Sequence, residues 1–441
     1  MLTQAGAALV GLFDSMMVGH YSTADLAAVS FSNAIFFTVM VFAMGALMGI
    51  TPLIGIEVGK AASSEGVPKD ACRNAIASLL QNGITFTLLL SLVMVVLLGA
   101  CIPFLDHFGQ DPVVITAAGP YFIMIVISIV PFLFFCLQKQ FLEGLGNTMV
   151  AMVISIVMNL LNIFLNWVLI FGHFGFEPMG ATGAGIATLV SRLLMPFCFT
   201  AVIYFKDDWR QYLQLFSRRL ASWTEVKRLI KIGAPIGGQS ILEAFIFTFS
   251  FVVMGWLSKE ALAAHQVANQ IADLTFMLAT GIGAATTIRV SHQLGKGDLV
   301  AVRMASNASI HLVLLMNTLG AILMISLRHQ IPYLFTEDEE VIRIASQLIL
   351  MAGLFQYADG LQTVGAAMLR GITDVKMPMV YAFFAYIVVA LPIGMVCVFP
   401  LHMGAVGMWL GFIVGLALAA ILFHTRFRRK YRELVAVHTF H

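Results

Sequence analysis

The sequence predicts an all-α integral membrane protein with twelve transmembrane helices arranged as two six-helix lobes. Of its 441 residues, 60% are hydrophobic and only 11% are charged, whereas about a quarter of residues are charged in soluble domains. The mean hydropathy is +0.92. Apolar runs of about 20 to 30 residues follow one another with short polar gaps, and each is long enough to cross a bilayer as a helix. The second half of the chain repeats the pattern of the first, which predicts two lobes of the same design.

Eleven apolar segments predict spanning helices in the order of the chain. Their approximate limits are 26–58, 74–101, 117–142, 149–171, 180–205, 232–257, 262–294, 304–326, 341–369, 377–399 and 403–424. Residues 1–19 predict a twelfth span. This segment has no basic region at its start and no small-residue cleavage site at its end, so it is not the pattern of a signal peptide.

The repeat aligns the stretch beginning at Leu26 with the stretch beginning at Leu262, without a gap. Identical pairs are Leu26/Leu262, Ala27/Ala263, Ala28/Ala264, Asn33/Asn269, Ile35/Ile271, Ala43/Ala279, Gly45/Gly281, Thr51/Thr287, Gly59/Gly295 and Lys60/Lys296. Weaker repeats pair "FLEGLGNT" from Phe141 with "MLRGITDV" from Met368, and "MGATG" from Met179 with "MGAVG" from Met403. A duplication of six spans is a common way of building transporters.

The duplication predicts the domain organisation. We expect an N-terminal lobe over 1–205, a cytoplasmic linker over 206–231, a C-terminal lobe over 232–424 and a basic tail over 425–441. The offset of the repeat places the counterpart of the start of the seventh span before Met1, so we expect the first helix to lack about five to nine residues.

Lysine and arginine residues are concentrated in alternate loops. They occur after the second, eighth and tenth spans, in the linker and in the tail, whereas Lys259, Arg328 and Arg343 are the exceptions in the other loops. The positive-inside rule therefore places both termini in the cytoplasm. We expect a multi-pass protein of a bacterial cytoplasmic membrane.

Four carboxylates, Asp14, Glu243, Asp273 and Asp359, lie well inside predicted spans. An acidic group at this depth costs a few kcal/mol or more, so it normally faces a bundle interior or a wet cavity. One interpretation is that each group is paired or protonated. The spans contain few basic partners, with Arg192 and Arg289 the main ones. The other interpretation is that these groups bind a proton, a sodium ion or a cationic substrate.

Three of these acids belong to the second half and lie at similar predicted depths. Glu243 and Asp359 are expected to converge on one cavity that takes a cation, including Na+. Asp273 is expected to join them, although it could face an interhelical pocket instead. Groups at such short range would titrate as a coupled set.

The first half carries a different polar set. Asn159, Asn162 and Asn166 follow an i, i+3, i+7 pattern and so share one helix face. These amides could simply join helices through hydrogen bonds. Alternatively, amide oxygens combine with Asp14 and the Thr188 hydroxyl as an all-oxygen site, which hard cations prefer.

The sequence contains no motif for nucleotide hydrolysis or covalent catalysis. It has no P-loop, HExxH or Gly-x-Ser-x-Gly pattern, and its five cysteines lack metal-ligand spacing. We therefore expect no enzyme activity, no cofactor and no nucleic-acid partner. An ion gradient is the expected energy source.

Several segments resemble the MATE (multidrug and toxic compound extrusion) family across nearly the whole chain. They are "GLFDSMMVGHYSTADLAAVS" from Gly11, "LEGLGNT" from Leu142, "APIGGQSILEAF" from Ala234, "GAATTIRVSHQLGKG" from Gly283 and "FQYADGLQTVGAAMLRGITD" from Phe355. The pair Glu243 and Asp359 is similar to the NorM-type branch of that family.

The resemblance implies two six-helix lobes related by a two-fold axis along the membrane normal, and a monomer that exports cationic drugs in exchange for Na+ or H+. It implies a cation and substrate site at Glu243 and Asp359. It also implies a cation or proton site in the first half, formed by Asp14, Asn162, Asn166 and Thr188. Two residues depart from the pattern. Asp273 replaces a small polar residue, and Phe355 replaces a tyrosine but keeps an aromatic face for a cation.

Three other classes of membrane protein fit the sequence less well. A major-facilitator antiporter should carry a G-x-x-x-D-[RK]-x-G-[RK]-[RK] pattern after the second span, where this chain has "GKAASSEGVPKDACR". A lipid-linked saccharide flippase should carry several basic residues in its cavity to hold pyrophosphate. A membrane-embedded prenyl transferase needs DxxxD motifs near a membrane face, and the acids here are isolated and deep.

Overall fold

The computed structural model describes residues 14–63, 68–108, 111–216 and 222–439, and all regular secondary structure in these ranges is helical. Eleven helical segments in them are long and apolar enough to cross a membrane. This confirms the all-α membrane fold and the eleven spans predicted after the first. The expected span over 1–19 is described only from Asp14 onward, where the chain is helical to Tyr21.

Contacts divide the chain into two compact units, one over 2–61 and 66–237 and the other built on 238–441. The boundary lies within helix α10 (Trp223–Leu257). The helices before it are α2 Thr23–Leu47, α3 Ile50–Ala61, α4 Lys69–Cys101, η1 Ile102–Phe108, α5 Pro112–Ile127, α6 Ile129–Gly144, α7 Met149–Phe171, α8 Gly180–Phe205 and α9 Asp207–Gln214. Those after it are α11 Lys259–Lys296, α12 Leu299–Leu327, η2 Ile331–Leu334, α13 Glu339–Gly371, α14 Lys376–Phe383, the π-helix η3 Phe384–Ala390, α15 Leu391–Val398 and α16 Ala405–Thr439.

Two predicted spans of the first unit are each divided into two helices. The segment predicted over 26–58 is interrupted between α2 and α3, where a side chain on Gly49 would come within 3.2 Å of the backbone nitrogen of Gly233. The segment predicted over 117–142 is interrupted at Ser128, whose hydroxyl donates to the carbonyl of Ile125 at 2.7 Å. Such bonds to a preceding carbonyl often accompany bends in helices, and hydropathy does not reveal them.

The predicted linker and tail both contain helix. The linker includes α9, whose Trp209 and Tyr212 side chains are buried, and the first turns of α10. The predicted tail is the continuation of α16 to Thr439. The last spanning helix therefore carries its basic residues on a rigid extension beyond the apolar segment.

A close helix crossing in the first unit uses a threonine and a glycine. The hydroxyl of Thr51 on α3 lies 2.6 Å from Oε1 and 3.1 Å from the backbone carbonyl oxygen of Gln140 on α6, and donates to this residue. One turn later, a Cβ on Gly144 would lie 2.8 Å from the Cβ of Ile54 and 3.1 Å from the carbonyl of Thr51. Only glycine permits helices α3 and α6 to approach this closely.

The second unit repeats this crossing between α11 and α13. Thr287, the counterpart of Thr51, donates to the carbonyl of Ala367 at 3.1 Å. A Cβ on Gly371 would lie 2.7 Å from Cγ1 of Val290 and 3.2 Å from the carbonyl of Thr287. The duplication inferred from the sequence is therefore present as a repeated backbone contact.

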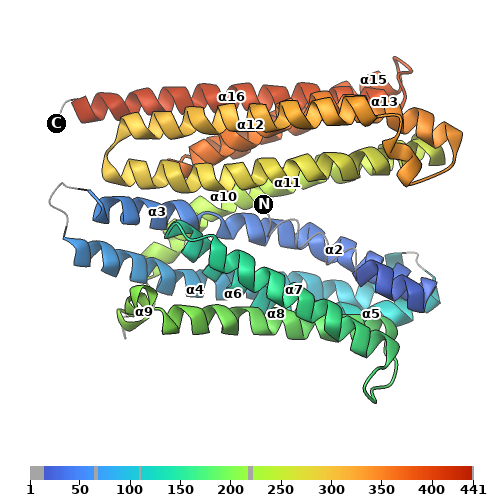
Figure 1. Ribbon diagram of the computed structural model, residues 1–441, viewed down its shortest axis with the longest axis horizontal. Helices are drawn as coiled ribbons and strands as arrows, with labels where there is room; N and C mark the ends of the chain where they lie inside the picture. Colours follow the sequence, from blue (N-terminus) through green and yellow to red (C-terminus); the bar gives the residue numbers. More distant parts are fainter. Residues whose placement is uncertain (1–13, 64–67, 109–110, 217–221, 440–441) are drawn as a thin grey trace. The chain divides into compact units, whose positions relative to one another are not determined.

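Helix α13 is the central helix of the second unit. It packs against α11, α12 and α16 (Figure 1), and it contributes buried residues from Val341 to Gly371. Its middle is thus shielded on several sides by neighbouring helices, which places Asp359 inside the unit.

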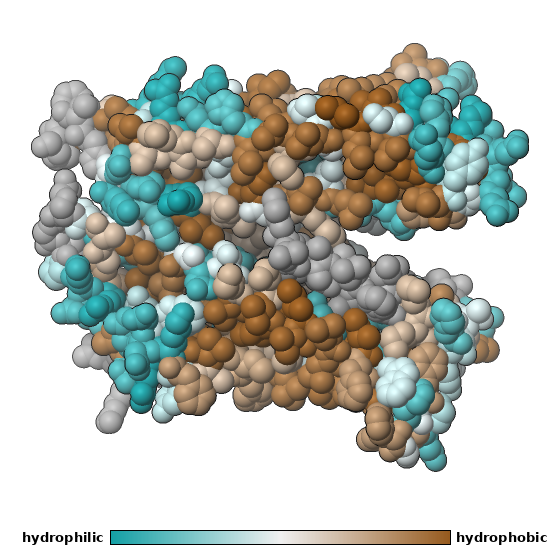
Figure 2. Space-filling view, viewed as in Figure 1, coloured by the Kyte–Doolittle hydropathy of each residue, from teal (hydrophilic) through white to brown (hydrophobic). Residues whose placement is uncertain are grey.

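Apolar side chains cover the middle of the helices in each unit, and hydrophilic side chains cover their ends (Figure 2). Helix α4 exposes Leu88, Leu92, Val93 and Val96, and α12 exposes Leu315, Leu319, Ile322 and Leu323. An exposed apolar belt of this kind is expected where the surrounding solvent is lipid.

Candidate functional site

Two intramembrane carboxylates of the second unit are joined by one glutamine. Glu243 is on α10 and Asp359 is on α13. The amide nitrogen of Gln362 lies 2.8 Å from Oε1 of Glu243 and 3.5 Å from Oδ1 of Asp359. Asp359 is only 2% exposed and Gln362 only 1%. The structure therefore brings together the two acids that the sequence placed on separate spans.

The orientation of the glutamine is set by Tyr386. This tyrosine lies in the π-helix η3, is fully buried, and donates its hydroxyl to Oε1 of Gln362 at 2.7 Å. With its oxygen occupied in this way, Gln362 presents its NH2 group to the carboxylates. π-Helical segments are rare and frequently occur at functional sites.

Replacing Tyr386 with phenylalanine should measure the contribution of this hydrogen bond to stability without changing the packing of the ring. Tyr386→Phe keeps the ring but leaves Oε1 of Gln362 without its donor, which should cost about 1–2 kcal/mol in the free energy of unfolding. Denaturant unfolding of the purified protein in detergent measures this cost. The matched control is Tyr381→Phe, because Tyr381 makes no side-chain hydrogen bond with a described residue. Equal stability of the two variants would contradict the role given to Tyr386.

The polar group of the first unit also contains a carboxylate and amides. Asn166 on α7 donates to Asp14 and to Oδ1 of Asn162, the second bond at 3.3 Å. Asn166 is fully buried and Asn162 is 4% exposed. Oδ1 of Asn166 has no hydrogen-bond partner in the described part of the chain. Thr188 on α8 is half-buried and makes no side-chain hydrogen bond with a described residue.

A basic residue of the same unit is held by aromatic rings. The guanidinium of Arg192 lies 4.8 Å from the ring centroids of both Phe36 and Phe132 and donates to Ser128 at 2.8 Å. Cation–π contacts of this kind stabilise a guanidinium away from water. Among the described residues, Arg192 forms no ion pair with a carboxylate. The first unit therefore combines Asp14 with a separately held cation.

Comparison with known proteins identifies the family. The MatE family model matches residues 1–168 and 235–396. The chain belongs to the MatE family.

MatE relatives of NorM type align along nearly the full chain. Multidrug resistance protein NorM of Photobacterium profundum is 31% identical over 425 residues, which cover 95% of this chain and 91% of the relative. A probable multidrug resistance protein NorM of Rhizobium meliloti is 33% identical over 433 residues, covering 96% and 90%. The resemblance to the NorM-type branch is thereby confirmed.

Solved MATE structures share the fold. An outward-facing multidrug resistance MATE transporter has a TM-score of 0.87 at 20% identity, covering 99% of this chain and 94% of the other. The eukaryotic MATE transporter AtDTX14 has a TM-score of 0.84 at 19% identity, with coverages of 98% and 95%.

The two positions that depart from the MatE pattern lie in different surroundings. Asp273 on α11 is exposed, and its nearest side-chain donor is Asn269 at 3.4 Å. No group of three His, Cys, Asp or Glu side chains that could hold a metal ion occurs in the described ranges. The structure thus joins Glu243 and Asp359 through Gln362 and does not join Asp273 to them by a hydrogen bond.

Phe355 lies in an aromatic cluster of the second unit. It is 2% exposed, and its ring centroid is 5.5 Å from Trp409, 6.0 Å from Phe247 and 6.3 Å from Phe412. All three rings are edge-on to it. These contacts are those of a packed core residue, whereas the sequence predicted a face presented to a cation.

Gln362 and Tyr386 were not predicted from the sequence. Gln362 stands three residues after Asp359, so helical spacing places both on one face. Tyr386 carries no comparable signal, because its contact with Gln362 depends on how η3 packs on α13.

Proposed function

We propose that this MatE protein exports several kinds of organic cation from the cell in exchange for Na+ or H+. The names of its NorM relatives, which are multidrug resistance proteins, support transport of diverse small molecules. The absence of catalytic motifs from the sequence supports transport without chemical conversion. The proposed form is a monomer in the bacterial cytoplasmic membrane.

The observation that carries this proposal is the carboxylate pair at Gln362. Among the described residues, no basic side chain lies within salt-bridge distance of Glu243 or Asp359, and the charge of Arg370 acts on Glu243 from farther away. Glu243 and Asp359 are held by one neutral amide, and two negative charges at short range disfavour joint ionisation. The pair therefore attracts a cation. A proton, a sodium ion or a cationic drug relieves that repulsion.

Competition for this pair supplies the coupling. An ion and a drug that both neutralise Glu243 and Asp359 exclude one another, and each shifts the protein toward the conformation it binds better. Alternating binding of the two then moves them in opposite directions. No further energy source is required.

We propose that the polar group of the first unit forms a second site for a cation or a proton. Its donor set is the carboxylate of Asp14 with the amides of Asn162 and Asn166, and the Thr188 hydroxyl lies on the adjacent helix α8. Oδ1 of Asn166 is buried and has no hydrogen-bond partner among the residues that the structure describes. This supports the assignment, because an oxygen of this kind is a ligand for a hard cation.

The distribution of basic residues supports the proposed orientation. In the second unit, Lys296, Arg303, Arg370 and Lys376 flank the loops that follow α11 and α13, at the same end as the basic part of α16. The positive-inside rule assigns this end to the cytoplasm.

The proposal is tested by efflux from proteoliposomes. Ethidium export is followed under an imposed sodium gradient and then under a proton gradient, for the native chain and for Asp359→Asn. We expect one gradient to drive export, and Asp359→Asn to reduce it to the protein-free rate. Normal export by Asp359→Asn, or no export under either gradient, would refute the proposal.

A further inference from the structure

The end of α16 places a row of cations at a defined depth. The segment 405–423 is entirely apolar, and at 1.5 Å per residue it spans about 28 Å, close to the thickness of about 30 Å of a bilayer's hydrocarbon core. The helix continues without a break to Thr439. The next nine residues, 424–432, carry Arg426, Arg428, Arg429, Lys430 and Arg432 and therefore lie at the level of the lipid headgroups.

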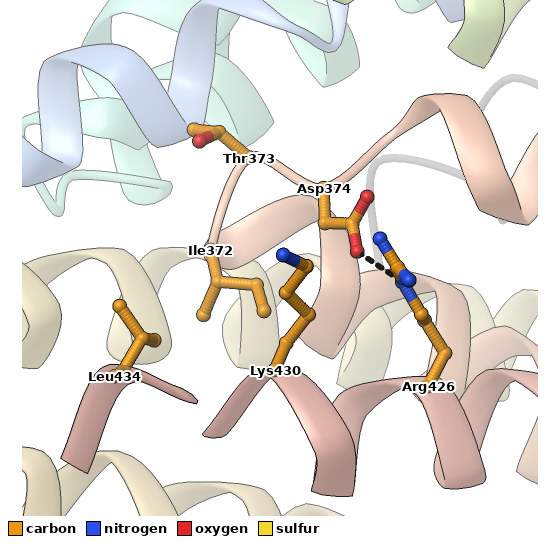
Figure 3. A pocket seen from close by; sticks show the side chains of 6 residues that line it. All are labelled: Ile372, Thr373, Asp374, Arg426, Lys430 and Leu434. Atoms are coloured by element: carbon orange, nitrogen blue, oxygen red, sulfur yellow. Dashed lines mark hydrogen bonds and ion pairs between the residues drawn. The ribbon is translucent and has the colours of Figure 1, made fainter. Parts of the chain in front are cut away.

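A pocket lies between this part of α16 and the loop after α13. Its volume is about 340 Å³, and it is lined by Ile372, Thr373, Asp374, Arg426, Lys430 and Leu434. Figure 3 shows the side chains of Arg426 and Lys430 extending from α16 toward the loop, with Ile372 and Leu434 on one flank. Nε of Arg426 donates to Oδ2 of Asp374 at 2.7 Å.

Positive charge exceeds negative charge around the pocket. The five cations in this part of α16 outnumber the two nearby carboxylates, Asp374 and Glu433, and two of the five, Arg426 and Lys430, line the pocket. Glu433 accepts from Lys430 at 2.6 Å and from Arg429 at 3.3 Å. Arg428 and Arg432 are exposed and form no ion pair with a described residue. A ligand that adds negative charge here is favoured.

We infer that this pocket binds the headgroup of an anionic phospholipid. The phosphate lies against Arg426 and Lys430, and the apolar flank formed by Ile372 and Leu434 receives the start of the acyl chains. Clusters of four to eight basic residues next to a membrane helix are typical of anionic-lipid binding. The depth of the pocket, at the end of a spanning segment, favours a lipid over a soluble phosphate.

The loop that lines the pocket follows directly from α13, the helix that carries Asp359. Asp374 holds this loop to α16 through Arg426. A bound phosphate would share Arg426 with Asp374 and so form an additional connection between the lipid surface and the end of α13. The inference does not depend on the proposed drug export, because it requires only that α16 spans the membrane.

Lipid binding to the full chain in detergent tests the inference. Phosphatidylglycerol or phosphatidylcholine is titrated, and bound lipid is counted by native mass spectrometry. We expect phosphatidylglycerol to bind at least about fivefold more tightly than phosphatidylcholine, and Lys430→Gln to remove about fivefold of that affinity, the factor that one basic residue contributes near an anionic surface. Lys430→Gln is preferred to Arg426→Gln, since the latter would leave Asp374 without its partner.

The matched control is Arg343→Gln at the opposite end of α13. Arg343 is also paired with a glutamate three residues away, Glu340, at 2.6 Å, but it lies outside the pocket. Arg343→Gln should leave phosphatidylglycerol binding unchanged. Equal affinity for the two lipids, or equal effects of Lys430→Gln and Arg343→Gln, would overturn the inference. Binding of inorganic phosphate with the affinity of phosphatidylglycerol would also overturn it, because the site would then be one for a soluble anion.

Discussion

Glu243→Gln is expected to weaken the binding of a model organic cation, tetraphenylphosphonium, on the order of 100-fold, because close charge pairs in desolvated sites contribute about 3 kcal/mol. The same loss is expected for Asp359→Asn. The two carboxylates share the amide of Gln362, so the first substitution already disturbs the partner of the second. The double variant should therefore lose less affinity than the sum of the two single losses.

Isothermal titration of the purified protein measures these affinities. Asp273→Asn provides the matched control, since Asp273 is an intramembrane acid of the same unit whose side chain is exposed and contacts Asn269. It should keep the native affinity within about threefold, because Asp273 is outside the hydrogen-bond network and acts on Asp359 only as a separate charge. If Asp273→Asn weakens binding as strongly as Glu243→Gln, the three acids form one site, as the sequence suggested. Strict additivity of the first two substitutions would instead argue against a shared amide.

Gly371→Ala is expected to destabilise the second unit by about 3 kcal/mol, at the upper end of the usual cost of overpacking. The added methyl would lie 2.7 Å from Cγ1 and 2.8 Å from Cβ of Val290, and 3.2 Å from the carbonyl of Thr287. Neither the Cβ of Val290 nor the carbonyl of Thr287 can move aside as the end of a flexible side chain could. Helices α11 and α13 must therefore separate to accept the change, and the Thr287 hydrogen bond is lost with it.

The melting temperature and the folded yield in detergent measure this effect. Gly144→Ala, at the equivalent crossing of the first unit, should behave in the same way. Gly255→Ala is the control, because Gly255 is in the last turn of α10, which ends at Leu257, and has open space around it. Alanine there should leave the stability unchanged or raise it by up to about 1 kcal/mol. A Gly371→Ala protein as stable as Gly255→Ala would show that the crossing is loose.

Much of the fold was predictable because membrane insertion is a constraint on continuous stretches of sequence. All eleven spans after the first were found from apolar length alone, since a bilayer of fixed thickness requires runs of about 20 residues. The interruptions at Gly49 and Ser128 and the π-helix η3 were not predicted. They leave hydropathy unchanged and arise from the close approach of another helix or from a side-chain hydrogen bond to the backbone.

The candidate site was predictable in part for a similar reason. A charge such as Asp359 in an apolar run is costly at any rotation of its helix, so its position alone marks it. Gln362 is neutral and Tyr386 is partly apolar, and residues of both kinds occur in spans without special function. Their roles appear only when the hydrogen bonds are seen.

The membrane class, the spans after the first, the duplication and the identity of the intramembrane acids follow from the amino-acid order alone, because hydrophobic length and the cost of charge act on each segment separately. The packing of the helices places Glu243 and Asp359 together at Gln362, leaves Asp273 exposed and encloses Phe355 among other rings. These outcomes depend on how each helix is rotated about its axis and where it crosses its neighbours. Side-chain packing determines the rotation and the crossing point of each helix, and neither can be calculated from hydropathy along the chain.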